Sequence, residues 1–338
     1  MVTMKEIAEM CGVSRGTVDR ALNGRGRVNP QTEQAILSMA KQLGYEPNPA
    51  GKALAARKHK PLISVILSSE GNAFFDDVLR GMKDAANDYE IYGLEVQYHT
   101  MKGYSVDKQI ELLEQVKKSS SSIIVNPIDN PRIAELLNKF VEEKIFVVTV
   151  NNDIKNCARQ CFVGSDYFNG GLTACALFEA FLGKSAKIGI VTGSNQILGH
   201  RERLQGFQKR MEQLPNFKIL EIVENDDDEI TSYSVTQKLL KNFPEVDGLF
   251  LVAGGVYGAS RAVSELPEEN RPTVIAFDAV PTTVEMMQKK IVKAILYQHP
   301  YRQGHRAIDL AFEFLVNGRS PAKAEHIFKN EIRLLENL

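Results

Sequence analysis

The sequence predicts three parts: a small helical N-terminal domain at residues 1–46, a short hinge at residues 47–60, and a two-lobed α/β body with parallel sheets at residues 61–338. Two short amphipathic patterns around a glycine-containing turn predict the helical domain. Helix-forming but weakly apolar residues predict a hinge helix that is marginal by itself. From Leu62 onward, apolar runs alternate with amphipathic stretches, which is typical of βαβ units.

The first helix is predicted between Thr3 and Gly12. Thr3 and Glu6 have the spacing of a capping box, which satisfies free backbone amides at a helix start. Ile7 and Met10 then supply an inward apolar stripe at helical spacing. Gly12 follows where the helix must stop, because glycine accepts the left-handed conformation of a helix end.

The second helix is predicted to begin after Ser14, which can cap it. Its inward face carries small and apolar residues, and its outward face carries Arg15, Gly16, Thr17 and Arg20. This is the layout of a helix-turn-helix, in which the start of the second helix meets base edges in the major groove. Arginine binds guanine O6 and N7 bidentately, so Arg15 and Arg20 are predicted to read bases. A third helix is predicted from the Asn29-Pro30 start signal to Gly44.

The charge distribution favours DNA binding over the alternative of a helical bundle without a nucleic-acid partner. Residues 1–60 contain 10 Lys and Arg against 5 Asp and Glu, a net charge of +5. The whole chain has a formal net charge of −1, so the rest of the chain carries −6. A basic head on a near-neutral protein predicts local attraction to phosphates.

The N-terminal residues resemble the lactose-repressor family of bacterial transcription regulators. The resemblance rests on residues 4–8, 12–14, 17–23, 28–29, 44–48 and 53–55. It implies that Arg15, Gly16 and Arg20 face bases, and that Thr3, Asn23, Thr32 and Asn48 approach the phosphate backbone. The predicted DNA-contacting set also includes Thr17, Tyr45, Lys52, Leu54 and Ala55. One departure is Asp19, where the family usually has serine, and this leaves the half-site sequence open.

The hinge segment has two interpretations. The resemblance implies that Leu54 is wedged into the minor groove at the centre of a palindromic operator. Two hinge segments of a dimer could then fold together on the duplex, because the close fit offsets the unstacking of bases. The alternative is a passive linker, which would favour Gly and Ser rather than the helix formers of residues 52–57.

The body is expected to contain two α/β lobes, because ten strands over 278 residues are many for one sheet. The predicted strands are Leu62–Leu67, Glu95–Thr100, Ile123–Pro127, Phe146–Asn151, Phe162–Gly164, Lys187–Gly193, Lys218–Glu224, Gly248–Val252, Val274–Phe277 and Lys293–Tyr297. The predicted helices include Phe75–Tyr89, Val106–Lys118, Ile133–Lys144, Asn169–Leu182, Leu204–Gln213 and Val235–Asn242.

A ligand site is predicted at the carboxyl ends of these strands, where open α/β sheets bind ligands. The candidate residues are Phe74, Phe75, Asn126, Asn151, Asn152, Arg201, Asp278 and Gln298. Aromatic rings can cover the C–H faces of a sugar or polyol, while the amides, the carboxylate and the guanidinium bind its hydroxyls. Three alternatives stay open: the phenylalanines belong to the core, Asp278 caps the next helix, or Arg201 forms a surface ion pair.

The body is similar to the two-lobed, type I periplasmic-binding-protein fold, especially its ribose-binding type. The similarity rests on Phe74-Phe75, residues 124–127, residues 201–207, Phe277-Asp278 and residues 298–300. It implies that Phe74, Phe75, Asn126, Arg201, Asp278 and Gln298 line the cleft between the lobes. Asn151-Asn152 replaces an Asp-Arg pair of pentose binders, and Ala253-Gly254 replaces Asn-Asp. These departures argue against ribose itself but not against a sugar-like ligand.

Several functional classes lack their sequence signals. There is no secretory signal and no apolar run long enough for a membrane span, so a cytoplasmic protein without a membrane partner is expected. The four cysteines and six histidines do not cluster, and no phosphate loop or dinucleotide motif follows a strand. We therefore expect no metal, no cofactor and no enzymatic activity. Gly254-Gly255 is interpreted as a sharp entry into a helix.

The predicted function is a ligand-controlled transcription regulator, a repressor, that binds a double-stranded DNA operator. A homodimer is expected because palindromic operators mirror two-fold protein symmetry and because the chain ends without extra leucine heptads. The effector is expected to be a small sugar or polyol, with a purine-like corepressor as the alternative. A pure solute-binding protein and a sugar-processing enzyme are the rival classes.

Overall fold

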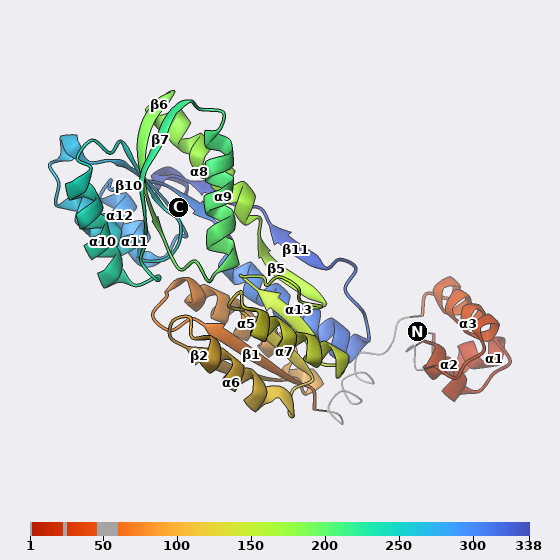
Figure 1. Ribbon diagram of the computed structural model, residues 1–338. Helices are drawn as coiled ribbons and strands as arrows, with labels where there is room; N and C mark the ends of the chain where they lie inside the picture. The colour runs from red at the N-terminus through yellow and green to blue at the C-terminus, as the bar shows by residue number, and fades with distance from the viewer. Residues whose placement is uncertain (1, 23–25, 46–59) are drawn as a thin grey trace.

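The computed structural model describes residues 2–22, 26–45 and 60–338, and its N-terminal domain is a bundle of three helices (Figure 1). They are α1 (Met4–Met10), α2 (Arg15–Leu22) and α3 (Pro30–Gln42). Ile7, Val18 and Ile36, one from each helix, are fully buried in a shared core. The three predicted helices are therefore confirmed. The predicted contacts Asn23, Asn48, Lys52, Leu54 and Ala55, and the predicted hinge helix, lie outside the described residues.

Local signals in the sequence set the ends of these helices. The Glu6 amide donates to Thr3 Oγ1 at 3.3 Å, and the Thr3 amide donates to Glu6 Oε2 at 2.7 Å. The predicted capping box is thus present. Ser14 Oγ accepts a hydrogen bond from a backbone amide in the first turn of α2. Gly12 and Gly44 adopt φ values of 63° and 62°, the left-handed conformation expected just after a helix.

The first lobe of the body is a parallel six-stranded sheet covered by helices on both faces. The strand order is β11-β5-β4-β3-β1-β2. These strands are β1 (Leu62–Ser68), β2 (Glu95–Met101), β3 (Ser122–Val125), β4 (Phe146–Val150), β5 (Cys161–Ser165) and β11 (Glu325–Phe328). One apolar cluster packs α5 (Phe74–Asp88) and α13 (Pro300–Asn317) on one face. Another packs α6 (Val106–Lys117) and α7 (Pro131–Glu142) on the other face, and a short 3-10 turn, η1 (Glu90–Tyr92), precedes β2.

The second lobe repeats this plan with the strand order β12-β10-β9-β8-β6-β7, in which β12 alone is antiparallel to its neighbour. Its strands are β6 (Ser185–Thr192), β7 (Asn216–Glu224), β8 (Gly248–Leu251), β9 (Thr273–Phe277), β10 (Val292–Tyr297) and β12 (Glu331–Arg333). Its helices are α8 (Tyr167–Leu182), α9 (Leu198–Met211), α10 (Glu229–Asn242), α11 (Val256–Ser264) and α12 (Pro281–Gln288), with 3-10 turns η2 (Glu268–Asn270) and η3 (Leu335–Asn337). The chain passes between the lobes after β5, after β10 and after β11.

The predicted two-lobed architecture is confirmed, and all ten predicted strands are present. Two further strands, β11 and β12, were not predicted; they are short outer strands whose side chains are at most half-buried. Short exposed strands lack the apolar run that marks a buried strand. Among the described residues, no helix is both long and apolar enough to cross a bilayer.

Glycines allow several helix pairs to pack at very short distances. A Cβ atom on Gly206 of α9 would lie 1.9 Å from the Phe168 carbonyl oxygen, and one on Gly171 of α8 would lie 1.9 Å from a carbonyl oxygen of α9. In the same way, a Cβ atom on Gly81 of α5 or on Gly304 of α13 would lie 2.0 Å from a carbonyl oxygen of the other helix. The backbone cannot move aside as a flexible side chain can, so these positions have no room for the side chain of any residue other than glycine.

Substituting Gly206 with alanine is expected to destabilise the body by about 2–3 kcal/mol, because the added methyl group must separate α8 from α9. Urea unfolding followed by circular dichroism would measure this change. Gly16→Ala is the matched control, since the nearest atom to its new Cβ would lie 3.8 Å away. Alanine at that helical position should stabilise the head by up to about 1 kcal/mol. Equal effects of the two substitutions would show that the crossing is not tightly packed.

Candidate functional site

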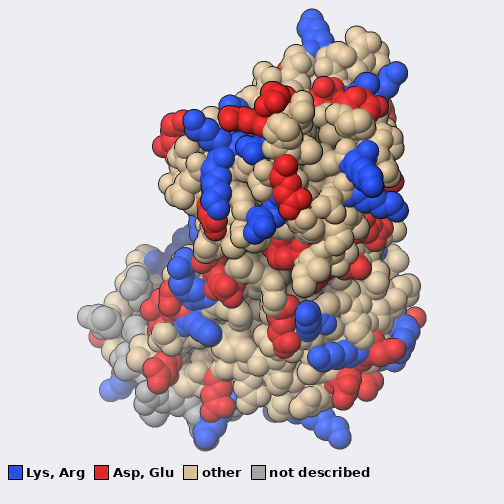
Figure 2. All heavy atoms as spheres, turned by 90° about the vertical axis from the view of Figure 1, so that its left-hand side faces the viewer, with Lys and Arg blue, Asp and Glu red and all other residues tan. Residues whose placement is uncertain are grey.

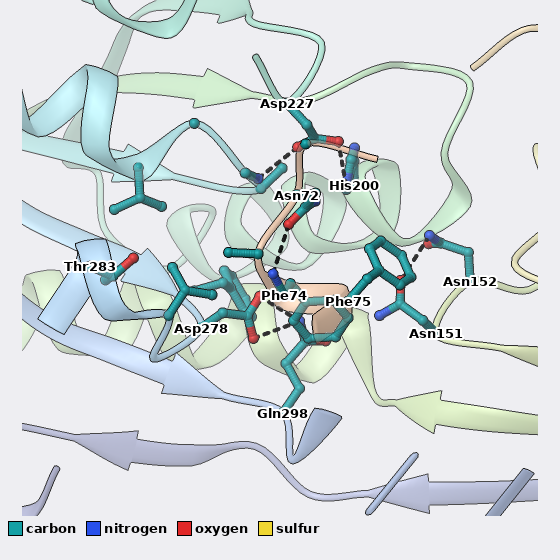
Figure 3. Close-up of a pocket in the computed structure, with 18 of the residues that line it drawn as sticks. Asn72, Phe74, Phe75, Asn151, Asn152, His200, Asp227, Asp278, Thr283 and Gln298 are labelled. Atoms are coloured by element: carbon teal, nitrogen blue, oxygen red, sulfur yellow. Dashed lines mark hydrogen bonds and ion pairs between the residues drawn. The ribbon is translucent and has the colours of Figure 1, made fainter. Parts of the chain in front are cut away.

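A cavity of about 270 Å³ lies between the two lobes (Figure 3). Seven of the eight residues predicted from strand ends line it: Phe74, Phe75, Asn126, Asn151, Asn152, Asp278 and Gln298. They follow β1, β3, β4, β9 and β10. The carboxyl ends of the strands in both sheets therefore face one shared space, as the topology of parallel sheets requires.

The two phenylalanines form an apolar wall of the cavity. Phe74 and Phe75 open α5 and are 6% and 5% exposed, with their rings edge-to-face at 5.2 Å between centroids. Both rings also pack against the core of the first lobe. They thus belong to the core and line the cavity at the same time, so the two interpretations of the sequence are compatible.

Three asparagines form a hydrogen-bonded amide group on the first lobe. Asn126 Nδ2 donates to Asn151 Oδ1 at 3.2 Å, and Asn152 Nδ2 donates to the same oxygen at 3.2 Å. All three side chains are buried. Because Asn151 Oδ1 already accepts two hydrogen bonds, the amide groups of its neighbours are held in fixed orientations beside the phenylalanines.

Asp278 follows β9 and is held by Gln298, which follows β10. Gln298 Nε2 donates to Asp278 Oδ1 at 3.0 Å and to Oδ2 at 2.9 Å. Burial raises the pKa of Asp278 to about 6, against the opposing influence of the Arg203 guanidinium. Helix α12 has Val280 at its N-cap without a side-chain cap, so Asp278 does not cap this helix.

The structure brings Arg203, rather than the predicted Arg201, to the cavity. Arg201 pairs with Asp129 of the first lobe and donates to the Asn195 carbonyl oxygen at 2.6 Å. This is the ion-pair alternative of the sequence analysis, although the pair joins the two lobes. Arg203 is 4% exposed, donates from Nη1 to the Val252 carbonyl oxygen at 2.7 Å, and places its guanidinium carbon 3.8 Å from the centre of the Phe277 ring.

A second acidic centre, not predicted from the sequence, forms around Asp227 in the loop after β7. Asp227 Oδ1 accepts a hydrogen bond from the Gly254 amide at 2.6 Å. Oδ2 accepts one from the Tyr104 hydroxyl, which reaches across from the first lobe. Burial raises the pKa of Asp227 to about 7, helped by the nearby negative charges of Asp278 and Glu229 and opposed by the Gly254 amide.

His200 of α9 faces Asp227 (Figure 3), with its Nε2 3.9 Å from Asp227 Oδ2. Burial, together with the nearby Arg203 guanidinium, lowers the pKa of His200 to about 3. The ring is therefore neutral at physiological pH. Nδ1 lies 3.2 Å from the Ser194 carbonyl oxygen, which can only accept, so Nδ1 carries the proton and Nε2 is a bare acceptor.

Three of the polar cavity residues adopt a left-handed backbone conformation. The φ values are 61° at Asn151, 58° at Asp227 and 66° at Asp278. Asn and Asp tolerate this region better than other non-glycine residues, and such conformations concentrate at binding sites. This backbone feature thus marks one residue after β4, one after β7 and one after β9 as parts of a common site.

Replacing Asp227 with asparagine is expected to make stability less dependent on pH. The folded pKa of about 7 lies above the ordinary value of 3.8, so the folded state holds this proton more tightly. That stabilisation is complete below pH 4 and is lost as the pH rises through 7. Between pH 5 and 8, the wild type should lose on the order of 2 kcal/mol relative to the variant. Urea unfolding of both proteins across this range is the measurement, and parallel profiles would contradict the raised pKa.

The predicted DNA contacts that the structure describes in the head are exposed or partly exposed. Arg15, Gly16 and Arg20 are exposed on α2, while Val18 and Ala21 of the same helix are buried. The predicted positions Thr3 and Thr17 stand at the starts of α1 and α2, Thr32 lies in the first turn of α3, and Tyr45 follows that helix. In contrast, Figure 2 shows positive and negative side chains interspersed over one face of the body.

Within the described residues, no group of three His, Cys, Asp or Glu is placed to hold a metal ion.

A helix-turn-helix head joined to a two-lobed body with a polar cavity defines a ligand-responsive DNA-binding regulator. Residues 3–48 match the lacI family of bacterial regulatory proteins, and residues 63–320 match the periplasmic binding protein domain. The chain therefore belongs to the periplasmic binding protein domain family, and it carries a lacI-family regulatory domain at its N-terminus.

Similar proteins include the ribose operon repressor of Bacillus subtilis, 25% identical over 83% of this chain and 82% of that protein. Catabolite control protein A of Priestia megaterium is 24% identical over 82% of each chain. Among solved structures, the glucose-galactose binding protein GanP from Geobacillus stearothermophilus superposes with a TM-score of 0.76, 21% identity and coverage of 82% of this chain and 98% of that chain. A solute-binding protein from Burkholderia graminis, in complex with D-arabinose, superposes with a TM-score of 0.76 and 21% identity. The match covers 82% of this chain and 96% of that chain. These structures share the fold.

Proposed function

We propose that the chain is a homodimeric transcriptional repressor that binds a palindromic operator under the control of a sugar or polyol in the interlobe cavity. The observation that carries this proposal is the convergence of residues from both lobes on one polar, ring-lined space. A ligand there contacts both lobes at once and so changes how they sit relative to each other. We infer that this change decides whether the hinges at residues 47–60 fold together on DNA.

The chemistry of the cavity supports a polyhydroxylated ligand. Phe74 and Phe75 offer apolar faces for C–H groups, while Asp278 and the asparagine amides offer hydrogen bonds to hydroxyls. Solved proteins of the same fold are described as binding D-arabinose, D-allose and glucose or galactose. These sugars are therefore the first probes.

A dimer is supported by apolar side chains that stay exposed along the C-terminal segment. Ile327, Ile332, Leu334, Leu335 and Leu338 are 39–42% exposed, and a second copy of the chain would cover such residues. Two heads related by a two-fold axis would then meet the two halves of a palindrome. Light scattering should give about twice the chain mass of 37.7 kDa.

The test is operator selection followed by gel retardation. The full chain would be used to select a palindromic site from random duplexes, and retention on that site would be measured with and without sugars, polyols and purines. One compound should change operator affinity about 5- to 150-fold, the usual range of allosteric coupling. Absence of sequence-specific retention in either condition would overturn the proposal. A compound that stabilises the wild type and Asp278→Ala equally would show that the ligand binds elsewhere.

A further inference from the structure

The cavity contains more acidic than basic groups. Asp227 and Asp278 lie in its wall and Glu229 lies at its rim, whereas Arg203 supplies the only guanidinium among the lining residues. Arg203 acts on Asp278, whose pKa it lowers against the effect of burial. Among the described residues, no Lys or Arg nitrogen lies within ion-pair distance of Asp227 or Glu229, which are held by the amides of Gly254 and Gly258.

Two hydrogen-bond acceptors face each other at the Asp227 end without a donor between them. Asp227 Oδ2 and His200 Nε2 are 3.9 Å apart, beyond hydrogen-bond distance, and Nε2 is the unprotonated nitrogen of a neutral ring. Tyr104 donates to Oδ2 but leaves further acceptor positions on the carboxylate. A donor from a ligand that sits between these two atoms would satisfy both.

Four further polar atoms of cavity-lining side chains have no partner: Thr283 Oγ1, Gln298 Oε1, Tyr167 Oη and Arg203 Nε. Thr283 Oγ1 and Gln298 Oε1 belong to side chains that are 0% and 2% exposed, and neither atom makes a hydrogen bond. Both residues line the cavity (Figure 3). A buried polar atom without a partner is costly, so the Thr283 and Gln298 oxygens indicate ligand groups that can donate hydrogen bonds, while Arg203 Nε indicates an acceptor such as a ligand hydroxyl.

We propose that the natural ligand is an aminated polyol or amino sugar, whose ammonium group donates to Asp227 Oδ2 and His200 Nε2. This inference rests on the proposed function, because it takes the cavity as the effector site. An ammonium group carries three donors and no acceptor, which matches the excess of acceptors there. Its positive charge also compensates Asp227, which no cationic side chain of the described residues does.

The affinity for such a ligand should rise with pH as long as its amine stays protonated. The groups that face Asp227 are Tyr104 from the first lobe, neutral His200 from α9, the Gly254 amide after β8, and the negative charges of Asp278 and Glu229. None of these groups carries a positive charge, so none can take the place of the ligand's ammonium group. As Asp227 ionises between pH 6 and 8, the affinity for an ammonium ligand should increase up to about tenfold.

The experiment compares two matched pairs of probes on the full chain: 1-amino-1-deoxy-D-sorbitol against D-sorbitol, and D-glucosamine against D-glucose. Calorimetry and thermal shift at pH 7 and constant ionic strength would give the affinities. At least one aminated probe should bind about 10- to 100-fold more tightly than its hydroxyl partner, the strength expected for a hydrogen bond to a charged group. If neither aminated probe binds better than its partner, the inference is overturned.

Asp227→Asn removes the charge-assisted contact. The affinities of the aminated and hydroxyl probes should then differ by no more than about threefold. Glu229→Gln should act in the same direction but less, because Glu229 is exposed at the rim. Asp226→Asn is the matched control: it removes the same charge from an exposed neighbour that does not line the cavity. An equal effect of the substitutions at 226 and 227 would contradict the proposed contact between the ammonium group and Asp227. If neutral sugars bind and shift operator affinity, only this inference fails; if aminated probes bind without changing operator affinity, the proposed function fails instead.

Discussion

Replacing Arg203 with methionine is expected to weaken binding of the cavity ligand by at least about a hundredfold. Removing one member of a buried charged interaction typically costs about 3–5 kcal/mol, which corresponds to a change of roughly 150- to 5,000-fold. Arg203 is 4% exposed, donates to the Val252 carbonyl oxygen and stacks on Phe277. Methionine fills a similar volume without the charge, so Asp278 would lose the guanidinium that acts on it.

The matched control is Arg201→Met, two residues earlier on the same helix. Arg201 lies outside the cavity wall and acts through its pair with Asp129, so we expect a loss below about tenfold. Calorimetry with the sugar or polyol that stabilises the wild type most would compare the two variants, with thermal unfolding as a check on folding. A larger loss for Arg201 than for Arg203 would contradict the placement of the guanidinium.

Arg201 was predicted from its place after the sixth strand and from the resemblance to periplasmic binding proteins, whereas Arg203 is the arginine that lines the cavity. The apolar pattern suggested a helix over Leu204–Gln213, whereas α9 runs over Leu198–Met211. Its buried positions are Leu198, Gly199, Arg203, Gly206 and Phe207, spaced as one face of a helix. Once the helix begins at Leu198, Arg203 falls on this inward face and Arg201 does not. The helix start is therefore the observation that distinguishes the two arginines, and the predicted helix Leu204–Gln213 did not include it.

The seven cavity residues that the sequence did predict could be found because each follows a strand, and strands carry a strong apolar signal. The same rule could have located Asp227, since it follows β7 within the run Asn225-Asp226-Asp227-Asp228. The sequence does not say which acid faces inward. Backbone conformation decides this: Asp228 caps α10 by accepting from the Thr231 amide, while Asp227 turns toward Tyr104. His200 gave no signal because a lone histidine on a helix has many interpretations.

Arg15→Ala in the head is expected to have the largest effect on operator binding. Arg15 is the first residue of α2 and is exposed, the position from which a recognition helix contacts bases. A bidentate arginine–guanine contact is worth about 1–3 kcal/mol, and a dimer would lose two of them. The operator affinity should therefore fall between about 30-fold and 10⁴-fold.

Lys41→Ala is the control for charge, because it removes one exposed positive charge from the last turn of α3 in the same head. Anisotropy on the selected operator and on a scrambled duplex, at one fixed salt concentration, would separate the two effects. Both substitutions should weaken binding to the scrambled duplex to a similar, small degree, because that binding depends on phosphates. Only Arg15→Ala should also reduce the ratio of operator to scrambled affinity. If the ratio is unchanged, Arg15 contacts phosphate, and base reading must then come from other exposed residues of α2, with Arg20 the first to test.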